Sequence, residues 1–181
     1  MADFEVFSVD LASLDRVVGA RDSKLLSAIA TPDDPPELRA AMQTIVGSGA
    51  RPFVGDPYSL ARATLRILRV VGRRVNANTS DLLHNASLGR VIDIERSLGL
   101  NVGVEELIAT DIVPMRGLPP DQEMRFGVIE APRISEAFAR WSNARPADAT
   151  DDDVDGILAE MLDWLEVAAL RRESLVGVYW L

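Results

Sequence analysis

Four arginines spaced along one predicted helix are the residues whose type and spacing most readily suggest chemistry. They are Arg62, Arg66, Arg69 and Arg73, separated by four, three and four positions. Such intervals return to the same face of a helix. Because the planar guanidinium group binds carboxylates and phosphates alike, these four residues are candidates for binding an anionic ligand or a protein partner.

The distribution of acids offers an internal explanation for the same arginines. Residues 58–75 contain five arginines and no acid, whereas residues 146–170 contain eight acids and no base. Like charges this close together repel one another unless negative charge lies nearby. Either the acidic helix packs near the arginine helix, or the arginines face solvent or an anionic partner.

Other arrangements that could support catalysis or metal binding are incomplete. The chain has no cysteine and one histidine, His84, which excludes thiol nucleophiles, HExxH zinc sites and cysteine zinc sites. Gly47-Ser48-Gly49 has the spacing of neither a nucleophile elbow nor a phosphate loop. Residues 151–156 copy half of a calcium loop, but Leu162 occupies the position that needs a carboxylate. We therefore expect no metal and no cofactor, and favour a protein that is not an enzyme.

Composition restricts the partners and the cellular location. The 181 residues are 48% hydrophobic and 26% charged, as in ordinary globular proteins, and the net charge is -9. An acidic surface repels nucleic acid, so no nucleic acid partner is expected. The longest stretch without a charged residue, Ala40 to Ala50, is too short to span a membrane. The N-terminus lacks a basic signal region, and we expect a cytoplasmic protein with no membrane association.

The elements that must position these residues follow from hydrophobic periodicity and from helix-capping residues. Strands are predicted over 4–9 and 175–181, and helices over 11–19, 22–29, 36–47, 58–75, 80–83, 88–98, 104–109, 132–143 and 151–170. Residues 112–127 hold three prolines and two glycines, which indicates a surface excursion or, alternatively, a segment with a strand. Residues 144–149 are expected to link two helices. The pattern predicts a mostly helical α+β fold, one domain over 1–181, with both terminal strands in a small sheet.

Three segments resemble a bacterial, largely actinobacterial, family of unknown function that is close to the YfbM-like proteins. They are Val6–Leu11 with Leu14 and Gly19, Pro114–Pro120 leading into Ile134–Trp141, and Trp164–Leu165 with Leu175–Trp180. The resemblance implies that the closing helix and strand pack beside the opening strand. It implies no activity and assigns no residue a role.

Taken together, these observations predict a bacterial interaction domain, of the immunity type, that binds another protein by complementary charge. The alternative is a small-molecule or phosphate-binding protein, or a hydrolase, that uses the arginine stripe. A homodimer with aromatic contacts near Trp180 is a further expectation.

Overall fold

An antiparallel sheet formed by the two ends of the chain organises the fold. The computed structural model describes residues 3–76, 85–97, 99, 102–108, 113–143 and 152–180. Within them the strands are β1 (Asp3–Val9), β2 (Arg73–Arg74), β3 (Met124–Ile129) and β4 (Ser174–Trp180). The sheet order is β2-β1-β4-β3, and β4 pairs with β1 from Asp3↔Trp180 to Val9↔Ser174. The predicted pairing of the terminal strands is therefore confirmed.

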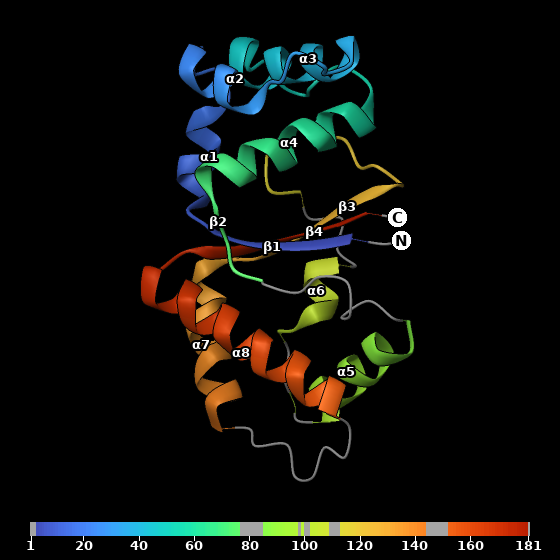
Figure 1. The fold of residues 1–181 in the computed structure, drawn as a ribbon. Helices are drawn as coiled ribbons and strands as arrows, with labels where there is room; N and C mark the ends of the chain where they lie inside the picture. The colour runs from blue at the N-terminus through green and yellow to red at the C-terminus, as the bar shows by residue number, and fades with distance from the viewer. Residues whose placement is uncertain are drawn as a thin grey trace.

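Helices cover both faces of this sheet (Figure 1). Above it lie α1 (Leu11–Val17), α2 (Ser23–Ile29), α3 (Pro36–Met42), a π-helical turn (Gln43–Ser48) and α4 (Pro57–Val71). Below it lie α5 (Asn85–Ser97), α6 (Val104–Ile108), α7 (Ala131–Asn143) and α8 (Asp152–Arg171). The mostly helical α+β fold class expected from the sequence is thus confirmed.

Alternation along the strands separates two hydrophobic clusters, because successive side chains point to opposite faces of a sheet. On β1, Phe7 and Val9 join the upper cluster, whereas Phe4 and Val6 join the lower one. On β4, Val176 and Val178 face upward. Since both faces are covered by helices, the strands are apolar almost throughout rather than on one face only.

Helix α4 is buried on two sides, which the sequence pattern did not indicate. It packs against α2 and α3 above and against the sheet below, as the ribbon shows (Figure 1). The Asp56 side chain caps its first turn by accepting a hydrogen bond from the Ser59 backbone N–H, and Pro57 occupies the first helical position. Only a narrow lateral strip of α4 is left for polar side chains.

Two expectations about the arginine helix are wrong. The helix ends at Val71 rather than Val75, and Gly72 adopts an extended conformation that leads the chain into β2. Arg73 consequently lies on a strand that pairs with β1, not on the helical stripe. The acidic helix α8 packs below the sheet, opposite α4, so of the two alternatives left open by the sequence, the one in which the charged helices lie side by side does not hold (Figure 1).

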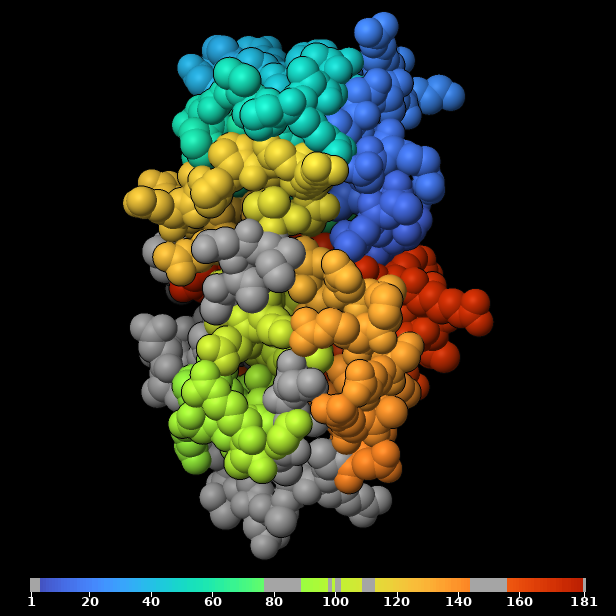
Figure 2. Space-filling view, turned by 180° about the vertical axis from the view of Figure 1, so that it is seen from behind, coloured from blue at the N-terminus to red at the C-terminus, as the bar shows by residue number. Residues whose placement is uncertain are grey.

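The segment before α7 contains a strand, which confirms the alternative expectation for that region. Strand β3 pairs with β4 from Met124↔Trp180 to Ile129↔Leu175, and all its residues except Arg125 are buried. Seen from behind, residues 113–130 form a band between the N-terminal helices and α5 with α7 (Figure 2). The expected helix over 80–83 and the linker over 144–149 lie outside the described residues.

Candidate functional site

Three of the four predicted arginines line one open hollow beside α4. The hollow has a volume of about 340 Å³ and will be called the arginine hollow. Its lining side chains come from α4, β3 and β4, and they are Tyr58, Arg62, Leu65, Arg66, Arg69, Met124 and Trp180. Met124 and Trp180 reach it together because they are register partners on neighbouring strands. The site thus joins one helix to the end of the sheet where the chain termini lie.

Of these three arginines, Arg62 is the one with no carboxylate partner in the described part of the chain. Its guanidinium carbon lies 5.7 Å from the centre of the Tyr58 ring, one helical turn earlier, which is a cation–π distance. Among the described residues, no carboxylate forms an ion pair with Arg62. Its charge is therefore available to an anionic group that enters the arginine hollow.

Arg66 is held by a carboxylate from the loop that follows α2. Its two terminal nitrogens donate to the two oxygens of Asp34 at 2.7 and 2.6 Å, and Nη1 also donates to the Ile29 carbonyl. Burial alone would raise the pKa of Asp34, but hydrogen bonds from Arg66 and Thr31 outweigh it and lower that pKa to about 2. Arg66 thus fixes α4 to the helical layer above it.

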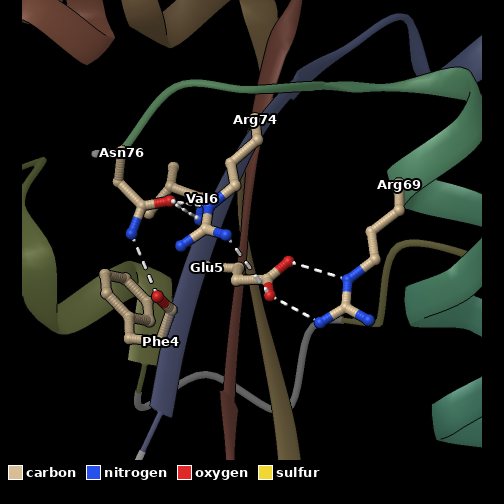
Figure 3. A network of polar contacts seen from close by, with 6 residues as sticks. All are labelled: Phe4, Glu5, Val6, Arg69, Arg74 and Asn76. Atoms are coloured by element: carbon tan, nitrogen blue, oxygen red, sulfur yellow. Dashed lines mark hydrogen bonds and ion pairs between the residues drawn. The ribbon is translucent and has the colours of Figure 1, made fainter. Parts of the chain in front are cut away.

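Arg69 is held by a carboxylate that rises from the sheet (Figure 3). Its Nε and Nη2 donate to the two oxygens of Glu5 at 3.1 and 2.6 Å. Arg74 approaches the same carboxylate at 3.7 Å from β2. Glu5 points from β1 toward α4 and is 5% exposed, so this ion pair lies between the helix and the sheet.

An asparagine secures the same strand from the side. The Asn76 amide oxygen accepts a hydrogen bond from the Val6 backbone N–H, and its nitrogen donates to the Phe4 carbonyl (Figure 3). Where β2 ends, the Asn76 side chain thus makes the backbone hydrogen bonds to β1 that a neighbouring strand would otherwise make. This contact holds β1, and therefore Glu5, in a fixed position beneath Arg69.

The structure divides the four predicted arginines and adds residues that the sequence reasoning missed. Arg73 is exposed on β2 and does not line the arginine hollow. Glu5 was detectable as the single acid within the apolar strand predicted over 4–9, and Tyr58 as the residue one turn before Arg62. Met124 and Trp180 had no such local signal, because only the register of β3 on β4 places them together.

The remaining candidates do not form a second site within the described residues. His84 lies outside them. The residues that resemble a calcium loop belong to a helix from Asp152 onward, as expected for an acidic helix N-terminus. In the described part of the chain, no three acidic or histidine side chains gather closely enough to hold a metal ion. No described helix is both long enough and apolar enough to cross a bilayer.

Comparison with known proteins places the chain in a family but supplies no chemistry. A family model described as a domain of unknown function matches residues 3–180, which is nearly the whole chain. No curated protein and no solved structure matches it. The geometry of the arginine hollow is consequently the main basis for a functional assignment.

Proposed function

The chain belongs to the DUF7691 family, whose description names no activity, and we propose from the arginine hollow that it is a protein-binding module. The hollow receives an acidic segment of a partner protein that carries an apolar side chain beside a carboxylate. The observation that carries this proposal is the convergence of Arg62, two aromatic rings and two apolar side chains on one open hollow.

The side-chain types around the arginine hollow support protein docking. Tyrosine, tryptophan, methionine and arginine are the residues enriched at protein interfaces and among the positions that dominate binding energy. Leu65 and Met124 are almost fully buried and supply an apolar floor, while Tyr58 and Trp180 are half-buried at its sides. An aliphatic or aromatic side chain would pack there while a neighbouring carboxylate meets Arg62.

Internal pairing argues against the alternative of a phosphate clamp or a hydrolase. Arg66 and Arg69 each already direct a guanidinium fork at a carboxylate, so Asp34 and Glu5 offset most of their charge. Among the arginines that line the hollow, a phosphate would find only Arg62 without a carboxylate partner in the described residues. The carboxylates of Asp34 and Glu5 lie next to the other two arginines and would repel it. A single carboxylate suits this electrostatic environment better than a multiply charged phosphate.

The net charge of the chain bears on which partners the hollow would select. A net charge of -9 would steer away most acidic proteins, so the hollow would select a partner by local rather than global charge. Bacterial origin, the YfbM-like relationship, the immunity type and a cytoplasmic location remain predictions. None of them is required for the binding mode.

Selection of peptides from a random display library tests the proposal without a known partner. The wild-type protein is the bait, and an Arg62→Glu variant removes peptides that bind elsewhere. We expect the enriched peptides to carry Asp or Glu within a few residues of Leu, Met or an aromatic residue. Enrichment of basic peptides, or equal capture by both baits, would overturn the proposal.

A further inference from the structure

Helix α8 exposes an acidic face on the far side of the molecule from the arginine hollow. Asp163 and Glu166 are exposed, and Leu170, on the next turn, has 78% of its surface exposed. Their spacing of three and then four residues places all three on one side of the helix. Asp163, Glu166 and Leu170 will be called the α8 face.

The carboxylates of the α8 face have no charged partner among the residues that the structure describes. Neither Asp163 nor Glu166 forms an ion pair or a side-chain hydrogen bond in the described part of the chain. The nearest base along the helix, Arg171, is engaged by Glu173 at 2.7 Å. The α8 face therefore presents uncompensated negative charge next to a large exposed apolar side chain.

This combination matches the chemistry that the arginine hollow is proposed to recognise. We propose that the α8 face of one copy docks into the arginine hollow of a second copy, an inference that rests on the proposed function. Leu170 packs against the apolar floor formed by Leu65 and Met124, and a carboxylate of the α8 face meets Arg62. The two charged regions that the fold keeps apart within one molecule thus meet between molecules.

The position of the two surfaces dictates a head-to-tail assembly. Helix α4, which supplies most of the residues lining the arginine hollow, lies above the sheet, and α8 lies below it (Figure 1), so each copy that donates one surface still offers the other. Such a heterologous contact builds open chains or rings rather than a two-fold dimer. One helix face in one hollow is a small interface, and because two copies of net charge -9 repel one another, the contact should form at a salt concentration that screens this repulsion.

Sedimentation velocity on the full chain, with two neutral variants, tests this arrangement. Arg62→Ala alters the hollow and keeps the α8 face, whereas Asp163→Asn with Glu166→Gln alters the α8 face and keeps the hollow. At about 0.15 M salt, which screens the repulsion between two acidic copies, and over about 1 µM to 1 mM, the wild type should form progressively larger species. Each variant alone should stay monomeric, and a mixture of the two should stop at a 1:1 dimer.

The outcomes separate this inference from the proposed function. A wild type that stays monomeric over the whole range overturns head-to-tail assembly, as does a variant that assembles as the wild type does. If self-association is absent but selected peptides still need Arg62, the hollow binds an acidic segment of a different protein. If the peptides do not need Arg62, the proposed function fails as well.

Discussion

At the scale of single residues, Glu95 is a buried carboxylate with few compensating contacts. It is 4% exposed on α5, accepts a hydrogen bond from the Val104 backbone N–H at 3.0 Å, and lies against Gly103. Burial raises the pKa of Glu95 to about 7, the Val104 N–H opposes that rise, and Glu105 with Glu106 adds to it. The folded protein therefore holds a proton there that the unfolded chain loses near pH 4.5.

This retained proton predicts how stability depends on pH. Between pH 4.5 and about 7 the folded state binds more protons at Glu95 than the unfolded state, so its contribution to stability falls as pH rises, by on the order of 3 kcal/mol. Glu95→Gln should flatten this decline and raise the melting temperature at pH 8. Thermal unfolding from pH 5 to pH 8 measures it, with the exposed Glu136→Gln as control. Parallel declines in the wild type and Glu95→Gln would contradict the prediction.

The Asp34–Arg66 pair predicts the opposite slope at acid pH. Because the folded pKa of Asp34 is lowered from 3.8 to about 2, its stabilising effect is complete above pH 3.8 and is lost as pH falls toward 2. Asp34→Asn should lower the melting temperature at pH 7 by more than about 4 °C, since Arg66 loses its carboxylate. The exposed neighbour Asp33 supplies the control, Asp33→Asn. Equal melting temperatures for the two variants would show that the pair contributes little.

Residue-level sequence reasoning named four arginines, three of which line the arginine hollow, but it did not indicate what they contact. The spacing of Arg62, Arg66 and Arg69 is a local property of a helix, and the sequence contains it directly. Their acids, Asp34 and Glu5, lie 32 and 64 residues away, and only the packing of α4 on the sheet and on the layer above makes them neighbours. Long-range pairing of this kind has no periodic signature.

At the scale of elements, two glycines allow α6 to pack directly on the sheet. Gly127 of β3 and Gly177 of β4 are register partners on the lower face. A Cβ atom at Gly177 would lie 2.2 Å from the Leu107 carbonyl oxygen, and one at Gly127 would lie 2.1 Å from the Glu106 carbonyl oxygen. Both contacts involve backbone atoms of α6, which cannot yield without moving the helix.

A pair of glycine substitutions tests this packing. Gly177→Ala should destabilise the fold by at least about 2 kcal/mol, because α6 would have to move away from the sheet. Gly156→Ala is the matched control: it lies within α8 with open space around it, and alanine there should be neutral or stabilise by up to about 1 kcal/mol. Urea unfolding of the three proteins gives both values. A Gly177→Ala variant as stable as the wild type would exclude tight packing of α6.

Helices and strands were predictable where hydrophobic spacing or composition indicated one structure, and they were missed where contacts with distant parts of the chain determine the structure. The apolar terminal strands and the helices α7 and α8 follow from composition and spacing. Strand β3 was ambiguous because the three prolines and two glycines of residues 112–127 indicated a surface excursion. Pairing with β4 and burial against α6 outweigh the low strand propensity of Gly127. The arginine helix was extended too far because Arg73 and Val75 continue its spacing beyond Gly72.

At the scale of the whole molecule, one sheet serves two hydrophobic clusters, and this predicts a single unfolding transition. β1 and β4 contribute side chains to both clusters, so neither can lose its strands without exposing the other. In a Trp180→Phe variant, which removes the tryptophan packed against the upper cluster, Trp141 and Trp164 report on the lower cluster by fluorescence, and far-UV circular dichroism reports on helices of both layers. The two melting curves should coincide. Separate midpoints would mean that the chain is not the single domain expected from its sequence.

The net charge of -9 conceals a separation of charge that the fold preserves. Within the described residues, acidic side chains without an ion-pair partner lie below the sheet on α8, and Arg62, also without one, lies above it in the arginine hollow. Of the four arginines on which the sequence focused attention, two bind internal acids and one lies on β2, so Arg62 carries the proposed recognition. Arg73→Ala is therefore a matched control for Arg62→Ala, because both substitutions remove one positive charge but only Arg62 lines the arginine hollow.

Calorimetric titration of a selected acidic peptide into wild type, Arg62→Ala and Arg73→Ala tests this account most directly. Loss of a central arginine contact costs at least about 1.4 kcal/mol, so Arg62→Ala should raise Kd about tenfold or more while Arg73→Ala leaves it within about twofold of wild type. If both substitutions weaken peptide binding equally, the peptide responds to the overall charge of the protein and not to the arginine hollow. An unchanged Kd for Arg62→Ala would contradict the arginine hollow as the binding site.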